Sequence, residues 1–547
     1  MALTDIEPKL YWTQKIKSDS RVLDPLGIFY HLKIQTDYVP AITSVTRRMR
    51  YYTLQAWFFK NMTENDNPHK LERLFILSTL FHHDGNPSHI SINHIFNKQY
   101  FENDWNTRNS FSLNSDFKIS GFGRTYYVRQ LERLRCAWHD GLKPHTTMIN
   151  DDLASTLTLE NHHLNQDQIS KSDLAQYSKL CICDSETNEN EIEVFSKILF
   201  GFLNLESPES IEDNIPDKYL DGTIDLLFSG IDDLSDKSIH HELTQRRRNT
   251  LFMFMKIIDQ VNPSKNEWEN TMMNVIYYKQ NPLTKNEINF GKLEKIRQYW
   301  EVHQYLIYFV FTMESILDIL QNQLRKNVDG IELKNFIDSF QRDKFQDSFN
   351  FISNSKINQN SSLSNLISIL DSKIDTNYAS MESTINEYSL MKSLKSTKSS
   401  EEKMSIVLVM ICLLRQRLDH LPQQILKNYS QSEVKDIDDD INLNNIMTFF
   451  DESKSCSLFD FSQKLIEKIS RKHLFESSRR YRFGTKNWIF TEEEGLLYPS
   501  GRKLVKINDR NNRWGPIYNL LLDTKMIQNE SNVTLTEKGK TWMQMIK

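Results

Sequence analysis

The sequence predicts a mainly α-helical, multi-domain protein that ends in a winged helix-turn-helix-like domain. At 547 residues the chain is long enough for several domains of ~100–200 residues each. It contains only 15 glycines and 13 prolines, too few for the many turns of a sheet-rich fold. No proline lies between Pro282 and Pro422, and no glycine between Gly330 and Gly484. The centre of the chain therefore lacks strong helix breakers.

Changes in composition divide the chain into four expected domains. Polar or turn-rich stretches mark the boundaries between them. The expected ranges are an N-terminal helical, aromatic-rich domain at 1–150, a polar and acidic connecting region with a helix at 151–237, a central helical domain with a long spine helix at 238–475, and a basic linker with the winged-helix-like domain at 476–547.

A helix predicted from Pro40 to about Lys60 carries a basic group beside its apolar stripe. Apolar residues recur there every three or four positions, which leaves Arg47, Arg48 and Arg50 off the buried seam. These arginines could contact phosphates or a partner as a second basic face. The favoured alternative is a solvated or internally paired face, because such arginines are common on amphipathic helices.

The densest histidine group follows a second helix, predicted at 71–81. His82, His83 and Asp84 resemble the ligand step of metal-dependent phosphohydrolases, since imidazole and carboxylate suit a divalent cation. However, Asp84-Gly85-Asn86-Pro87 is turn chemistry, whereas such ligands would lie on packed helices, so a surface loop is favoured over a metal site.

The five cysteines are scattered and odd in number, which argues against a disulfide framework and for a reducing, cytoplasmic location. Cys181 and Cys183 stand closer than the usual zinc-knuckle spacing, and no second cysteine pair exists to complete four ligands. No metal and no cofactor are therefore expected. The longest apolar runs fall far short of ~18 residues, so no membrane association is expected either.

Acidic residues between 206 and 236 leave a metal-dependent nuclease open as an alternative. Asp217, Asp221, Asp225, Asp232 and Asp233 precede the group His240, His241 and Glu242. No phosphate-binding G-x-x-x-x-G-K-[ST] loop occurs in the chain, so a P-loop ATPase is not expected. For the nuclease, the chain lacks a convincing acid followed by [DE]-x-K on a neighbouring strand. The nuclease is therefore the less favoured interpretation.

The strongest helical periodicity runs from Gly291 to Lys326. Its predicted buried seam consists of Ile296, Trp300, His303, Leu306, Val310, Met313, Leu317, Leu320 and Leu324. At ~1.5 Å per residue this spine would be on the order of 50 Å long, with His303 as a core residue. Residues 404–420 predict a central helix, and the Ser-, Asn- and Lys-rich segment 350–402 is a candidate for mobile or partner-dependent structure.

The C-terminal segment has the residue order of the second half of a winged helix. Asp509 could cap a short helix, Pro516 suits a first helical position, and the buried face of this helix would be Ile517, Leu520, Leu521 and Ile527. Val533 to Thr536 then predicts a strand that leads into a new helix. The exposed positions of the first helix would be Tyr518, Asn519, Asp523 and Lys525, which are nearly neutral together. The expected wing at 528–534 contains no basic residue, so sequence-specific DNA readout is not expected.

Positive charge is concentrated just before that helix. Residues 471–516 contain eleven Lys or Arg and five Asp or Glu, within a chain whose net charge is −5. The candidate DNA-binding residues are Arg479, Arg480, Arg482, Lys486, Arg502, Lys503, Lys506, Arg510 and Arg513. Such a group predicts salt-dependent phosphate contacts without sequence selectivity, and docking of a protein partner remains equally open.

Three short motifs at the two ends of the chain carry a family resemblance: Asp-Pro-Leu-Gly at 24–27, Arg-x-Arg-Tyr-Tyr at 48–52 and Leu-Thr-x-x-Gly at 535–539. The chain resembles helical prokaryotic proteins associated with anti-phage defence or DNA-modification gene clusters. The resemblance implies a role in a multi-subunit DNA-handling or antiviral defence assembly. The expected function is a non-catalytic adaptor that binds DNA or other protein subunits. The alternatives are a metal-dependent nuclease or phosphohydrolase and a purely structural scaffold.

Overall fold

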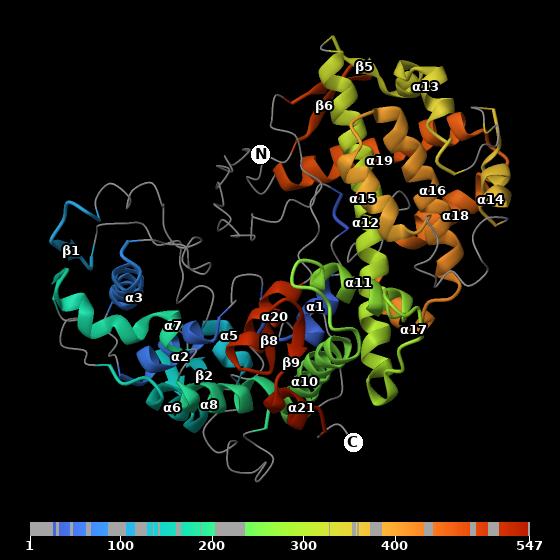
Figure 1. The fold of residues 1–547 in the computed structure, drawn as a ribbon. Helices are drawn as coiled ribbons and strands as arrows, with labels where there is room; N and C mark the ends of the chain where they lie inside the picture. Colours follow the sequence, from blue (N-terminus) through green and yellow to red (C-terminus); the bar gives the residue numbers. More distant parts are fainter. Residues whose placement is uncertain are drawn as a thin grey trace, which may run out of the picture. The chain divides into compact units, whose positions relative to one another are not determined.

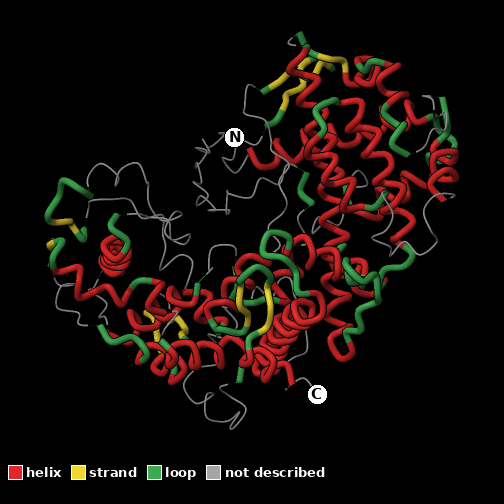
Figure 2. Tube along the Cα trace, in the orientation of Figure 1, coloured by secondary structure: helices red, strands yellow, loops and turns green. Residues whose placement is uncertain are grey.

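The computed structural model is mainly helical, as the sequence predicts (Figure 2). It describes residues 26–28, 32–43, 48–61, 67–85, 105–114, 128–134, 136–140, 143–159, 166–185, 188–202, 236–327, 329–352, 357, 360–371, 385–430, 441–481, 488–500 and 513–544. Within these ranges, none of the helices has the length and apolar character needed to cross a membrane.

The chain forms two compact units, and each unit combines segments that are distant in sequence. Unit 1 contains residues 1–32 and 301–510, and unit 2 contains residues 33–300 and 511–547. This division differs from the four consecutive ranges expected above, because the C-terminal segment belongs with the first 300 residues.

Unit 1 is built around α16 (Ser400–Leu418), whose residues are buried nearly all round, as predicted for this segment. Ser399 caps the helix by accepting a hydrogen bond from the backbone N–H of Glu402. The hydroxyl of Tyr305, on α12 (Glu294–Lys326), donates to the carbonyl of Leu414 at 2.9 Å. All nine residues of the predicted α12 seam are buried, so the prediction of the spine and of His303 as a core residue is confirmed.

A small sheet, ordered β5-β7-β6, completes unit 1. β6 (Phe490–Glu493) and β7 (Leu496–Pro499) form a hairpin through Glu494 and Gly495, both of which have positive φ as a tight hairpin turn requires. β5 (Ile331–Glu332) pairs with β7. The other elements of unit 1 are η8 (Leu333–Ser339), α13 (Arg342–Asp347), α14 (Leu363–Asp371), α15 (Glu387–Ser396), α17 (Gln423–Tyr429), α18 (Leu443–Glu452) and α19 (Leu458–Tyr481).

In unit 2, the C-terminal segment is a helix, a hairpin and a second helix. These are α20 (Trp514–Asp523), β8 (Ile527–Asn529), β9 (Val533–Leu535) and α21 (Glu537–Met543). A helix, the strand at 533–535 and a second helix follow one another as predicted, but Ile527, predicted on the buried face of the first helix, begins β8 instead. In Figure 1, α20, β8 and β9 lie beside α1 (Leu32–Tyr38) and α10 (Asp236–Val261). The expected cap Asp509 lies outside the described residues, and Arg513 occupies the N-cap position.

Aromatic side chains attach this segment to the rest of unit 2. The ring of Trp514 lies 4.5 Å from that of Trp300 and 5.2 Å from that of Phe254. Trp542 contacts Phe200, with ring centroids 5.0 Å apart. The remaining elements of unit 2 are α2 (Met49–Asn61), α3 (Pro68–His82), β1 (Ser110–Ser112), α5 (Val128–Arg133), β2 (Ala137–Asp140), β3 (Lys143–Thr146), α6 (Met148–Ser155), β4 (Gln168–Ser170), η4 (Asp173–Leu180), α7 (Ile182–Ser185), α8 (Glu189–Phe200), α11 (Trp268–Tyr278) and η7 (Gly291–Leu293).

Candidate metal centre

The C-terminal end of α3 presents two successive histidines. Asn67 caps the start of this helix by accepting a hydrogen bond from the N–H of His69. The helix ends at His82 with His83 as its C-cap, and the following Asp84 and Gly85 both have positive φ. The N–H of Gly85 donates to the carbonyl of Leu80 at 2.7 Å, which closes the end of the helix. The described part of the predicted turn, Asp84 and Gly85, is therefore a turn, and it leaves His82 and His83 at the helix end, while Asn86 and Pro87 lie outside the described residues.

Two cysteines face these histidines from the junction of η4 and α7. Cys181 ends η4, and its N–H donates to the carbonyl of Ser178 at 3.0 Å. Ile182, the first residue of α7, is fully buried and anchors the junction. Cys183 lies in the first turn of α7 and is partly exposed. The buried isoleucine thus fixes a short segment that carries one thiol on each side of it.

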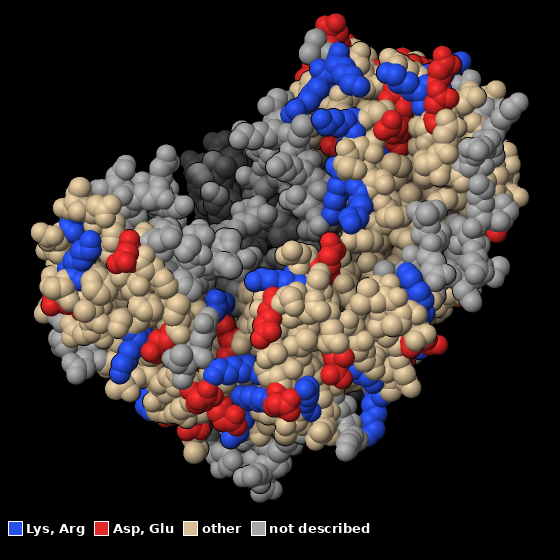
Figure 3. Space-filling model, viewed as in Figure 1, with Lys and Arg blue, Asp and Glu red and all other residues tan. Residues whose placement is uncertain are grey.

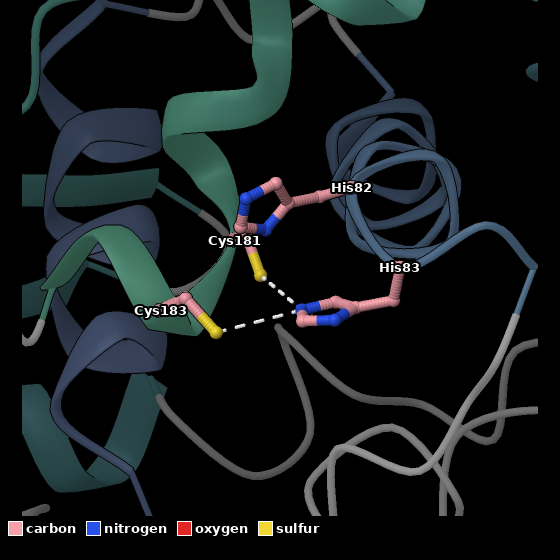
Figure 4. Close-up of side chains that lie close together, drawn as sticks. All are labelled: His82, His83, Cys181 and Cys183. Carbon is pink, nitrogen blue, oxygen red and sulfur yellow. Dashed lines mark hydrogen bonds between the residues drawn. The ribbon is translucent and has the colours of Figure 1, made fainter.

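The four side chains together have the ligand atoms of a metal site. One ligand atom from each of His82, His83, Cys181 and Cys183 lies within 4.8 Å of all the others. Figure 4 shows both imidazole rings reaching from the end of α3 toward the two sulfur atoms. Nε2 of His83 is 3.3 Å from Sγ of Cys181 and 3.5 Å from Sγ of Cys183.

These separations suit tetrahedral coordination. With Zn–S of about 2.3 Å and Zn–N of about 2.0–2.1 Å, the edge between a nitrogen and a sulfur ligand is about 3.6 Å. The two His83 edges already have this length, so the remaining distances of up to 4.8 Å must shorten by only about 1 Å. His82 is exposed at the rim, where its ring can move by this amount.

Burial affects the protonation of the Cys181 thiol, the more buried of the two. Loss of solvent around Cys181 raises its pKa to about 11, so the metal-free thiol is protonated at neutral pH. A metal ion that binds there must displace the proton, because the thiolate is the ligand form of cysteine.

Arg50 of α2 holds the segment that carries the cysteines. Its Nη1 donates to the carbonyl of Lys179 at 2.7 Å, and its Nη2 lies 3.2 Å from Oδ2 of Asp184. The same Nη2 lies 2.7 Å from Oε2 of Glu191 on α8, and both side chains of that pair are fully buried. The guanidinium therefore contacts residues on both sides of Cys181 and Cys183.

The cluster changes two conclusions drawn from the sequence. The sequence offers no second pair that would complete four ligands with Cys181 and Cys183, whereas the structure places His82 and His83 beside these two cysteines. Asp84, the third candidate ligand, does not belong to the cluster. The sequence signal for this cluster consists of two adjacent histidines and a C-x-C pair. The two pairs are about 100 residues apart in the chain.

The structure also corrects the prediction of a second basic face at Arg48 and Arg50, the two of its three arginines that are described. Arg48 Nη2 lies 2.8 Å from Oδ1 of Asp523, and Arg50 is buried against Glu191. Both arginines are internally paired, which is the alternative that the sequence favoured, so they cannot form a face for phosphates. Arg47 lies outside the described residues.

The structure describes three of the nine candidate DNA-binding residues, namely Arg479, Arg480 and Arg513. Of these, Arg513 is engaged inside unit 2 and is not available to bind phosphate. Its Nη1 donates to the carbonyl of Gln35 at 2.8 Å, and desolvation lowers its pKa to about 9. Arg479 and Arg480 are at the end of α19 in unit 1, where Arg479 Nη2 lies 2.7 Å from Oε2 of Glu476. Arg482, Lys486, Arg502, Lys503, Lys506 and Arg510 lie outside the described residues.

The expected recognition surface of α20 is buried at two of its four positions and half-buried at Asn519 and Lys525. None of its ten residues is exposed, and Tyr518 stacks on Trp268 with ring centroids 4.3 Å apart. Tyr518 and Asp523, predicted as exposed positions, are buried. Figure 3 shows acidic and basic side chains interspersed over this part of unit 2, where Lys525 pairs with Glu189 and Lys538 with Glu193.

Most residues of the alternative nuclease site lie outside the described residues, including all five aspartates between 217 and 233. His240 and His241 fall within α10, and the carboxylate of Glu242 pairs with Arg246 one helical turn later.

Comparisons with protein-family models, with curated proteins and with solved structures find no match to this chain.

Proposed function

We propose that this chain is a non-catalytic helical adaptor in which one zinc ion joins α3 to the η4–α7 segment. The observation that carries this proposal is the convergence of His82, His83, Cys181 and Cys183, whose ligand atoms lie within 4.8 Å of one another. Two thiolates and two imidazoles in a tetrahedral arrangement suit zinc, whereas Mg²⁺ and Mn²⁺ prefer oxygen ligands.

The ligand count supports a structural role for the ion. A catalytic zinc site keeps one coordination position for water or substrate, but here four protein side chains can fill all four positions. Such a site contributes folding free energy by joining two segments distant in sequence. A zinc ion with four protein ligands would therefore stabilise the fold, and it would leave no open position for the metal-bound water or substrate that the nuclease or phosphohydrolase alternative requires.

Cobalt substitution tests the ligand set. Co²⁺ bound by two thiolates and two imidazoles gives visible absorption bands of tetrahedral geometry and a sulfur-to-metal charge-transfer band. We expect both signals from the full chain. Cys183→Ser should weaken the charge-transfer band, and His83→Ala should alter the visible bands.

The matched controls are Cys456→Ser in unit 1 and His69→Ala on α3. Neither residue belongs to the cluster, so both variants should retain the wild-type cobalt spectrum. An octahedral spectrum without a sulfur band, or equal changes in the cluster variants and the controls, would exclude the proposed centre.

We further propose that residues 513–544 form a winged-helix-like docking element. The order α20, β8, β9, α21 supports this proposal, and the burial of α20 favours an internal docking role over groove readout. Any DNA contact would then depend on the basic residues between 482 and 510. If so, the triple variant Arg502→Ala, Lys503→Ala and Arg510→Ala should abolish salt-dependent DNA binding. Unchanged binding would leave protein partners as the adaptor's targets, and membership of a defence assembly stays a prediction.

A further inference from the structure

Three consecutive residues at the start of α2 connect the metal centre with the C-terminal segment. Arg50 contacts both sides of the cysteine-bearing segment through Lys179 and Asp184. The two residues before Arg50 form hydrogen bonds with Asp523, the last residue of α20. Nε of Arg48 donates to Oδ1 of Asp523 at 3.0 Å, and the N–H of Met49 donates to Oδ2 at 2.8 Å.

The position of Asp523 gives this contact its strength. Its carboxylate accepts the N–H of the first residue of α2, where the helix dipole favours negative charge. The pair with Arg48 is largely buried, with side-chain exposures of 14% and 3%. Removal of one partner from such a pair leaves an uncompensated charge, so α2 and α20 are held together at this point.

Helix α8 provides a second connection between the metal centre and the C-terminal segment. Glu191 of α8 faces Arg50 at 2.7 Å, whereas its neighbours Glu189 and Glu193 face the C-terminal segment. Glu189 pairs with Lys525, and Oε2 of Glu193 lies 3.4 Å from Nζ of Lys538. The N–H of Asn188, which caps α8, donates to the carbonyl of Asp184, directly after Cys183. The first turns of α8 therefore contact both the cysteine-bearing segment and the C-terminal segment.

We propose that zinc binding and docking of residues 513–544 are coupled, with Arg50 and Asp523 as the positioning residues. Zinc fixes the cysteine-bearing segment in the position that Arg50 contacts, and Arg50 fixes the start of α2 that receives Asp523. Such coupling is reciprocal, so docking of α20 must raise zinc affinity by the factor by which zinc favours docking. The inference rests on the proposed zinc centre.

Hydrogen exchange on the wild-type full chain tests one direction of the coupling. Zinc-loaded and chelator-stripped protein are compared peptide by peptide. We expect slower exchange in 514–543 with zinc, and equal exchange with and without zinc in β6 and β7, which belong to unit 1. Equal exchange of 514–543 in both states would overturn the proposal.

Zinc affinity of variants tests the reverse direction. Competition with a chromophoric chelator should show weaker binding for Asp523→Asn and for Arg50→Lys, by roughly fivefold or more. The control Glu537→Gln removes a carboxylate from the same segment, but the Glu537 side chain is 89% exposed and pairs with Lys540 of its own helix, so this variant should keep wild-type affinity. Arg48→Lys retains a charge beside Asp523 and should lie between wild type and Asp523→Asn.

The outcomes separate the two proposals. No zinc binding by the wild-type chain removes the zinc centre and the coupling with it. Zinc binding with equal affinity in wild type, Asp523→Asn and Arg50→Lys retains the centre and removes the coupling.

Discussion

Arg513 is expected to stabilise unit 2 rather than bind DNA, because its guanidinium donates to backbone carbonyls within the same unit. Nη1 contacts the carbonyls of Gln35 and Val39 at 2.8 and 3.3 Å. Arg513→Ala leaves these acceptors without their charged donor and should lower the free energy of unfolding by roughly 1–3 kcal/mol. Urea denaturation measures the change. Lys540→Ala, which alters an exposed ion pair, should leave the free energy of unfolding nearly unchanged. Equal stabilities would contradict the buried role of Arg513.

Glu476 should give unit 1 an acid-sensitive contribution to stability. Burial alone would raise its pKa, but the hydrogen bond from Arg479 and the charge of Lys472 outweigh this and hold the pKa below its ordinary value of 4.5. A depressed folded-state pKa stabilises the fold above pH 4.5, and this contribution is lost as the pH falls below that value. Glu476→Gln should therefore flatten the fall in melting temperature on acidification. A steeper fall, or the same fall as in wild type, would show that the pKa is not depressed.

Gly539 permits the closest approach within the C-terminal segment. A Cβ atom at this position would lie 2.1 Å from the carbonyl oxygen of Met526. The preceding Thr536 caps α21, since its Oγ1 accepts the N–H of Gly539 at 3.1 Å. The Leu-Thr-x-x-Gly motif thus has a structural explanation in capping and close packing.

Gly539→Ala should consequently destabilise unit 2 by about 1–3 kcal/mol, since the carbonyl is backbone and cannot rotate away. Gly515→Ala is the matched control: it lies within α20, and its new Cβ meets no atom within 4 Å. The control should be neutral or stabilising by up to about 1 kcal/mol. Thermal melts of both variants measure the difference, and similar destabilisation in both would count against the contact at Met526.

The helical elements were more predictable from sequence than the metal centre. The α12 seam follows from one continuous periodicity, and every residue predicted on it is buried. The candidate centre combines His82 and His83 with a cysteine pair about 100 residues later. No local pattern specifies that contact, because it depends on the packing of η4 beside α3. For the same reason Arg48 and Arg50 could not be assigned partners: Asp523 lies 475 residues after Arg48.

At the scale of the whole molecule, the C-terminal segment completes a unit formed mainly by the first 300 residues. Deletion of residues 511–547 removes Trp514 from Trp300 and Phe254, and it removes Asp523 from the start of α2. We expect the truncated chain to lose cooperative unfolding of unit 2, whereas unit 1 should retain its transition. Circular dichroism melts with limited proteolysis would detect this, and unchanged resistance of residues 33–300 would contradict the division of the chain.

The zinc content of the purified full chain tests the central claim most directly. After dialysis against buffer without chelator, elemental analysis should give about one zinc ion per wild-type chain, and close to none for the double variant Cys181→Ser, Cys183→Ser. Cys456→Ser, with its thiol in unit 1, should retain the wild-type content. Equal zinc content in the wild type and the double variant, or no zinc in either, would contradict the assignment of this cluster as a zinc centre.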